Sequence, residues 1–191
     1  MLHELGLEYE RRPIGSRTGE TQEPEFRQLN PREKIPVLQD GDLTLAESAA
    51  ILTYLAETYG ESTGLVPNLG TRDLAYYYQW CFFIMSELDA HNLYIVRKHV
   101  ALKDLYGEAP NAVRTALEGF EKQARVADLE LSRGGPSILG RQFTCADILL
   151  TTCLLTALPY HLKLGEVLKD YMEGVTARDA YQAGAAANRR L

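Results

Sequence analysis

The apolar and polar positions follow two different patterns along the chain, and the change falls near residue 70. Before it, a short β-rich run at 35–39, an Asp-Gly pair at 40–41 and a returning run at 43–45 predict an antiparallel hairpin with a tight turn. The segment 47–60 then places apolar residues at helical spacing and ends on glycine, which predicts an amphipathic helix. The first part of the chain is therefore expected to combine strands and helices.

From residue 71 onward the alternation typical of strands is absent, and apolar residues recur at the spacing of helices. The pattern predicts helices over 74–102, 113–131, 144–158, 163–171 and 177–187. The stretch 61–70 is rich in glycine, proline and asparagine, which is typical of a linker. We therefore expect a mixed domain over residues 1–60, a linker over 61–70 and an all-helical domain over 71–191.

Residues with binding chemistry flank the predicted hairpin on both sides. Pro36 lies inside the first strand, and because proline has no N–H to donate it belongs at a strand start, an edge or a special turn. A cis bond between Ile35 and Pro36 is possible, since the cis form is rare except before proline. Glu47 and Ser48 open the helix, where unpaired N–H groups and the helix dipole favour an anion.

Each of these residues also has a purely structural explanation. Ser48 could be no more than an N-cap, Lys34 a solvated charge and Pro36 a turn residue. Their order and spacing within the run 30–55 make that explanation improbable for the set as a whole. The run closely resembles the glutathione-binding half of a cytosolic glutathione S-transferase.

This resemblance implies a specific set of contacts with the tripeptide glutathione, the co-substrate of that family. The proline is cis, and the backbone of the residue before it, here Ile35, pairs with the cysteinyl part of glutathione. The pair at the helix start, here Glu47 and Ser48, holds the γ-glutamyl end, and Lys34 could reach the glycyl carboxylate by charge pairing. The candidate glutathione contacts are therefore Lys34, Ile35, Pro36, Glu47 and Ser48.

A second resemblance lies about a hundred residues further on. Thr144 is followed three places later by Asp147, which is typical of an N-cap with an acidic partner, and Phe143 and Ile148 occupy the two staple positions. The same cap begins a buried helix in the all-helical half of glutathione transferases. The two resemblances together imply an α+β chain, with a thioredoxin-like N-terminal domain followed by an all-α helical bundle domain.

The resemblance also implies that part of the family's first domain is missing. These transferases begin with a strand and a loop whose Ser, Tyr or Cys stabilises or replaces the glutathione thiolate, whereas this chain begins inside the helix that follows. We therefore expect a thioredoxin-like domain lacking its first strand, with 8–14 extended but without a neighbour. The catalytic residue is unknown and expected upstream of Met1. Either an earlier start codon, which we favour, or a natural remnant would account for the truncation.

Composition and charge exclude several classes of function. The chain has 191 residues, of which 46% are hydrophobic, and a formal net charge of −6, which argues against non-specific nucleic-acid binding. The absence of a long apolar run and of a signal peptide predicts a soluble, cytoplasmic protein that does not span a membrane. We expect no metal site. The three cysteines form no Cys-x-x-Cys pair, and Glu87 and His91, four residues apart, lack a further zinc ligand.

Three consecutive tyrosines, at 76–78, lie on a predicted helix. They cannot share one helix face, so at least one ring must point away from the core, either into a cleft or subunit interface or simply into solvent. In the family that the chain resembles, this helix faces both the second-substrate pocket and the partner subunit. The resemblance therefore makes four residues candidates for that pocket: Tyr76, Trp80, Phe83 and Glu87.

Three functional hypotheses follow. The first is a glutathione S-transferase-like enzyme that conjugates the glutathione thiolate to small electrophiles. The second is a glutathione-dependent isomerase or reductase on the same scaffold, distinguished by whether the activating loop carries Ser or Cys. The third is a non-catalytic binding or interaction module. The resemblance further implies a homodimer.

Overall fold

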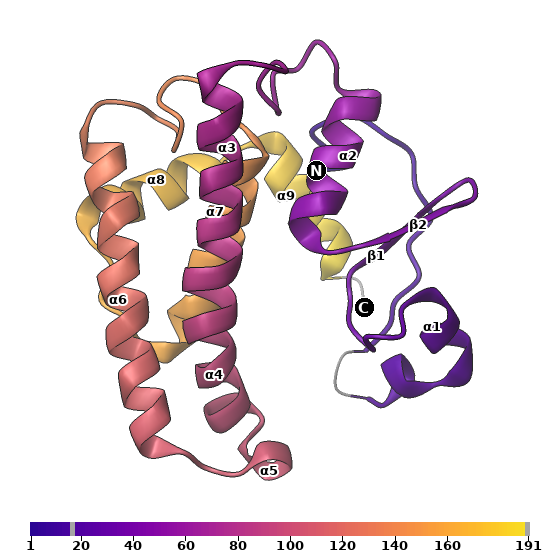
Figure 1. The fold of residues 1–191 in the computed structure, drawn as a ribbon, viewed down its shortest axis with the longest axis vertical. Helices are drawn as coiled ribbons and strands as arrows, with labels where there is room; N and C mark the ends of the chain where they lie inside the picture. Colours follow the sequence, from indigo (N-terminus) through magenta and orange to yellow (C-terminus); the bar gives the residue numbers. More distant parts are fainter. Residues whose placement is uncertain (16–17, 190–191) are drawn as a thin grey trace. The chain divides into compact units, whose positions relative to one another are not determined.

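The predicted hairpin is present in the computed structural model, which describes residues 1–15 and 18–189 (Figure 1). Strand β1 (Val37–Asp40) pairs antiparallel with β2 (Leu43–Ala46), and Asp40 lies opposite Leu43. The two-residue turn is thus at 41–42, one position later than the sequence pattern indicated. Gly41 has a φ of +59°, the left-handed conformation that tight hairpin turns require at this position. No further strand pairs with this hairpin within the described residues.

Two short helices precede the hairpin. The 3-10 turn η1 (Glu20–Gln22) leads into α1 (Pro24–Leu29), whose first residue is a proline that lacks only an N–H which would be unpaired there anyway. The helix ends at Asn30 because the next residue is a proline. The segment 8–14 is not part of a strand.

Helix α2 (Ser48–Tyr59) follows β2 and ends at Gly60, as the sequence pattern predicted. The hydroxyls of Tyr54 and Tyr59 both donate to Oδ2 of Asp40, at 2.8 and 2.5 Å. The bond from Tyr59, and then that from Tyr54, holds the pKa of the Asp40 carboxyl below its ordinary value, and the pKa of Tyr59 is raised to about 12. These two bonds join the end of β1 to the second half of α2.

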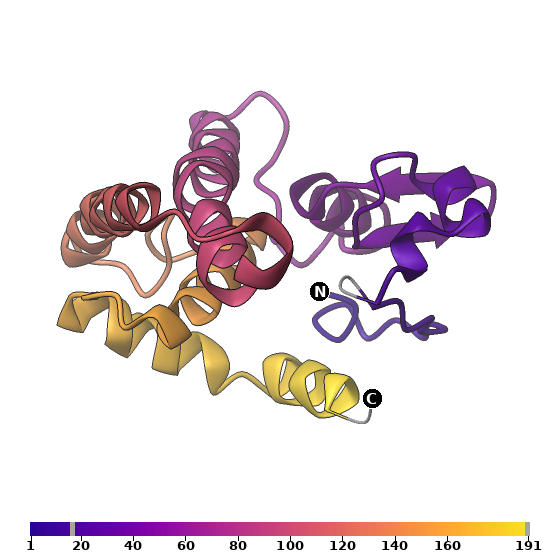
Figure 2. The same cartoon turned by 90° about the horizontal axis from the view of Figure 1, so that it is seen from below.

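The remaining elements are helical. They are α3 (Arg72–Phe83), η2 (Ile84–Leu93), α4 (Tyr94–Val96), η3 (Arg97–Ala101), α5 (Lys103–Tyr106), α6 (Pro110–Ser132), α7 (Cys145–Ala157), η4 (Leu158–Tyr160), α8 (Glu166–Thr176) and α9 (Asp179–Asn188). Helix α7 lies against α3 and α8, while α6 runs beside η2 and also contacts α8 (Figure 2). These contacts build the bundle that the helical periodicity predicted.

The first long helical segment is not a regular α-helix throughout, because η2 and η3 have π-helical hydrogen bonding. Within η2 the buried side chain of Asn92 donates through Nδ2 to the carbonyl of Glu87, at 2.5 Å. Its Oδ1 lies against Gly119 of α6, where an added Cβ would approach it to 2.3 Å. The apolar pattern predicted this helix but not its change of winding, because the spacing of apolar residues does not indicate which backbone hydrogen bonds form.

A buried carboxylate organises the start of α7. Asp147 accepts hydrogen bonds from the backbone N–H groups of Thr144 at 2.8 Å and Ile138 at 2.7 Å, and from the hydroxyl of Tyr171 at 2.8 Å. Burial raises the pKa of the Asp147 carboxyl, and these donors oppose that shift. The capping box predicted for Thr144 and Asp147 is confirmed.

The chain separates into two compact units. One consists of Met1–Thr63 together with Ala180–Leu191, and the other of Gly64–Asp179. The sequence pattern assigned α9 to the helical domain, whereas the structure groups most of it with the first unit, where the carbonyl of Ala187 accepts a hydrogen bond from Nη1 of Arg11. Periodicity predicts that a helix forms but carries no information about the unit that it joins.

Candidate functional site

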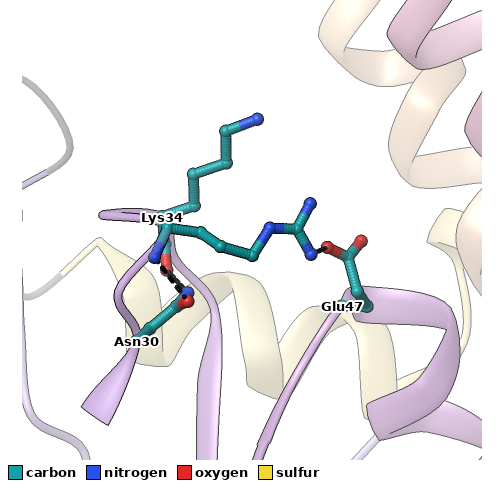
Figure 3. Close-up of polar contacts among 4 residues, drawn as sticks. Asn30, Lys34 and Glu47 are labelled. Carbon is teal, nitrogen blue, oxygen red and sulfur yellow. Dashed lines mark hydrogen bonds and ion pairs between the residues drawn. The ribbon is translucent and has the colours of Figure 1, made fainter. Parts of the chain in front are cut away.

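The loop between α1 and β1 is held from inside by one buried side chain. Asn30 is only 4% exposed, and its Nδ2 donates to the backbone carbonyl of Lys34 at 2.7 Å (Figure 3). Its Oδ1 accepts the backbone N–H of Arg32 at 3.1 Å, and its own carbonyl accepts the N–H of Glu33 at 3.0 Å. One side chain and its carbonyl therefore fix the path of the loop at three successive residues.

The loop ends in the Ile35–Pro36 bond, which is cis, as the family resemblance implied. The Ile35 side chain is exposed, and the paired residues of β1 begin at Val37. Within the described part of the chain the backbone N–H and C=O of Ile35 have no hydrogen-bond partner. An exposed residue with both backbone groups unpaired is suited to pairing with the main chain of a peptide ligand.

The start of α2 supplies a second set of unpaired groups. The first intrahelical bond runs from the N–H of Ile51 to the carbonyl of Glu47, at 2.9 Å, so the amides of residues 48–50 have no acceptor within the helix. The hydroxyl of Ser48 likewise has no partner among the described residues. Ser48 is the first helical residue, and Glu47 occupies the N-cap position instead. The helix therefore presents amide hydrogens and a hydroxyl where an anion is favoured.

The backbone of Glu47 is strained. Its φ of +74° and ψ of 116° lie outside the regions that side-chain-bearing residues normally adopt. Such conformations persist only where the surrounding structure imposes them, and they concentrate at functional sites. The strain fixes the direction in which the Glu47 side chain leaves the main chain.

An ion pair joins the loop to the start of α2. Nη1 of Arg32 contacts Oε1 of Glu47, and both side chains are about half exposed, at 57% and 52% (Figure 3). A second pair, from Nε of Arg27 in α1 to Oε1 of Glu33 in the loop at 2.8 Å, does not involve α2. The sequence pattern did not indicate Arg32, because the pair spans the whole hairpin and depends on its register.

The structure therefore brings the predicted residues to two neighbouring segments of one unit. The loop between α1 and β1, residues 30–36, is called the Asn30-anchored loop, and it contains Lys34, Ile35 and Pro36. The start of α2 contains Ser48, with Glu47 as its N-cap. The Lys34 side chain extends away from Asn30 (Figure 3). Sequence analysis missed Asn30 and Arg32, of which only the first gave a local signal, as an asparagine before a proline at a helix end.

The candidates for the second-substrate pocket differ in exposure. Tyr76 of α3 is 55% exposed, whereas Trp80 is buried at 7% and packs edge-on against the ring of Phe83 at 5.4 Å between centroids. Burial favours a packing role for Trp80. Phe83 and Glu87 are half-buried. As predicted, the three tyrosines do not share a face, because Tyr77 is fully buried while its two neighbours are exposed.

The three cysteines offer no thiolate in this structure. Cys81, Cys145 and Cys153 are free and buried, and burial raises the pKa of each thiol, to about 11 for Cys81 and about 12 for Cys145. Within 1–15 and 18–189, no three His, Cys, Asp or Glu side chains are grouped as a metal site would require. None of the helices in those ranges has both the length and the apolar character needed to cross a membrane.

Comparison with known proteins gives a consistent result. The family described as "Glutathione S-transferase, N-terminal domain" matches residues 1–57. Glutathione S-transferase 3 of Zea mays is 32% identical over 199 aligned residues, which cover 98% of this chain and 86% of the relative. Glutathione S-transferase F13 of Arabidopsis thaliana is 32% identical over 154 residues, covering 77% of this chain and 68% of the relative.

Solved structures share the fold. A glutathione transferase from Methylococcus capsulatus is 28% identical and superposes with a TM-score of 0.82, covering 100% of this chain and 91% of that structure. A glutathione transferase homolog from Lodderomyces elongisporus, solved with two glutathione molecules per subunit, has a TM-score of 0.86 at 23% identity, with 96% and 88% covered. The second likeness concerns the fold alone.

Proposed function

The chain belongs to the glutathione S-transferase family, and from this premise we propose that it binds glutathione at the Asn30-anchored loop and the start of α2. Its first unit contains a thioredoxin-like domain with a two-stranded sheet, and its second unit is all-helical. We further propose that the bound glutathione acts as a thiolate nucleophile toward small electrophiles, as the names of the relatives suggest.

The observation that carries the proposal is the set of unpaired groups at the start of α2. The γ-glutamyl end of glutathione bears an ammonium and a carboxylate. The free amides and the hydroxyl of Ser48 suit the carboxylate, and the acidic side chain of Glu47 suits the ammonium. The unpaired backbone of Ile35 suits the cysteinyl part, and the Lys34 ammonium suits the glycyl carboxylate.

In the proposed reaction, the thiol of glutathione loses its proton to solvent and the sulfur forms a bond to an electrophilic carbon. The displaced electron pair departs with a leaving group; where the carbon belongs to an activated double bond, the π pair of that bond moves onto the activating group, which takes up a proton from solvent. The residues of this chain bind and orient the tripeptide, and holding two reactants in line lowers the entropic part of the barrier. No described residue is assigned to stabilising the thiolate, since the three cysteines are buried and remain protonated.

Because no described residue is assigned to stabilising the thiolate, we propose as a second candidate function a glutathione-binding module without catalysis. Titration calorimetry with glutathione, beside a conjugation assay with an activated aryl halide, tests both functions. We expect one saturable site and weaker binding of the dipeptide Cys-Gly, which lacks the γ-glutamyl end. Binding with no conjugation supports the non-catalytic module. Failure of glutathione to bind contradicts both functions.

We also propose that the protein forms a homodimer through one face of α3. Phe82 is 72% exposed, and Tyr78, one turn earlier on the same face, is 40% exposed. Large exposed apolar side chains in one patch are typical of interaction sites. Light scattering is expected to give twice the chain mass, and Phe82→Glu is expected to give the monomer mass. A monomeric parent protein would contradict the proposal.

The proposed location is the cytoplasm. All three cysteines are free, which is typical of proteins kept in a reducing compartment. We expect cell fractionation to recover the protein in the cytoplasmic fraction.

A further inference from the structure

We propose that Arg32 is a positioning residue of the glutathione site, which orients the Glu47 carboxylate toward the ammonium of the ligand's γ-glutamyl end. The inference rests on the proposed function and adds to it a residue that acts through Glu47. It is drawn from the ion pair between Arg32 and Glu47 and from the way in which the loop presents Arg32.

The first step is that the backbone of Arg32 is fixed. Its N–H donates to the buried carboxamide oxygen of Asn30 at 3.1 Å, and the same carboxamide binds the carbonyl of Lys34 at 2.7 Å. The next residue, Glu33, has a φ of +57°, and its backbone N–H donates to the carbonyl of Asn30 at 3.0 Å. The guanidinium of Arg32 therefore extends from an anchored point on the loop.

The second step concerns the carboxylate that Arg32 contacts. The guanidinium binds Oε1 of Glu47, and Oε2 has no partner among the described residues. A carboxylate can accept several hydrogen bonds, so the pair leaves one oxygen available to a ligand ammonium. A glutamate side chain that is half exposed would otherwise sample many rotamers, and fixing it on binding costs about 0.5–1.5 kcal/mol. Arg32 fixes it before the ligand arrives.

The third step asks whether Arg32 positions the Glu47 carboxylate or competes with the ligand ammonium for it. A guanidinium that blocked Glu47 would have to leave before the ammonium could bind, and its removal would tighten binding. The single contact through Nη1 to one oxygen favours positioning, because the second oxygen needs no displacement.

The test compares Arg32→Ala with Arg27→Ala, a matched control that loses a partly exposed arginine ion pair between α1 and the loop. Each is titrated with glutathione and with an analogue in which hydrogen replaces the α-amino group. We expect Arg32→Ala to weaken glutathione binding about 2- to 10-fold, the affinity equivalent of fixing one side chain. We expect Arg27→Ala to bind like the parent protein, and Arg32→Ala to leave the affinity for the deaminated analogue unchanged.

Two further variants guard against a merely structural effect. Arg32→Lys retains the charge and should recover part of the lost affinity. In a Glu47→Gln background, Arg32→Ala should cause no further loss of affinity for glutathione, because the group on which it acts no longer carries a charge. Thermal unfolding of each variant, beside that of Arg27→Ala, shows whether the loop remains folded.

Each remaining outcome overturns the inference. Tighter glutathione binding by Arg32→Ala would identify a competitor. An equal loss for glutathione and its deaminated analogue would mean that Arg32 supports the loop or contacts a carboxylate. Parent-like binding by Arg32→Ala would remove Arg32 from the site while leaving the proposed function intact. If the parent protein itself does not bind glutathione, the proposed function fails and this inference fails with it.

Discussion

Replacement of Asp147 by alanine is expected to lower the free energy of unfolding by about 3–5 kcal/mol. The side chain accepts hydrogen bonds from two backbone N–H groups and the Tyr171 hydroxyl, in a fully buried position. Alanine offers no acceptor, and each buried donor left without a partner costs about 1–3 kcal/mol. Urea unfolding followed by circular dichroism measures the change.

The control for this prediction is Asp170→Ala, which removes an exposed carboxylate from the neighbouring helix α8. Surface substitutions of this kind change stability by no more than about 0.5 kcal/mol. If Asp147→Ala and Asp170→Ala unfold at the same urea concentration, the carboxylate does not organise the start of α7. Asp147→Asn should lie between the two, because one of its terminal atoms is a donor facing another donor.

Replacement of Ser48 by alanine is expected to weaken glutathione binding by about 1.5–3 kcal/mol, roughly 10- to 150-fold in the dissociation constant. The change removes a hydroxyl that has no partner among the described residues, at a helix start whose amides are also unpaired. A hydrogen bond from this hydroxyl to a ligand carboxylate would be charge-assisted, and such bonds are about twice as strong as neutral ones. Titration calorimetry measures the loss.

The control for the Ser48→Ala prediction is a ligand without the γ-glutamyl end. The dipeptide Cys-Gly lacks that end, so its weaker affinity should be the same for the parent protein and for Ser48→Ala. Ser132→Ala removes a hydroxyl that bonds within its own helix, to the carbonyl of Asp128 at 2.7 Å, and should leave glutathione binding unchanged. If Ser48→Ala binds glutathione as tightly as the parent protein, the start of α2 does not bind the γ-glutamyl carboxylate.

The hairpin, α2 and the capping box could all be predicted because their signals are local. The turn residues near Gly41, the glycine at the end of α2 and the Thr144 to Asp147 spacing each act within a few residues, although the turn itself lies one position later than the Asp-Gly pair indicated. The cis bond before Pro36 was possible on local chemistry and was implied by the family resemblance. Local chemistry was sufficient for these elements.

The rest of the site depends on contacts that no local pattern encodes. Arg32 and Glu47 meet only after the hairpin has folded in its observed register. The sequence is compatible with Ser48 as an N-cap, but Glu47 takes that position, and the sequence does not indicate the positive φ of this glutamate. The burial of Trp80 and the grouping of α9 with the first unit likewise follow from tertiary packing.

The fit of Asn92 against Gly119 limits how the helical unit can rearrange. Gly119 is the only glycine in α6, so it is the only position of that helix that can accept the Asn92 carboxamide without a side chain in the way. Sliding α6 by one turn along η2 would present Thr115 or Gln123 to the same carboxamide. The contact between Asn92 and Gly119 therefore disfavours a one-turn shift of α6 along η2, because the incoming side chain would have to displace the carboxamide.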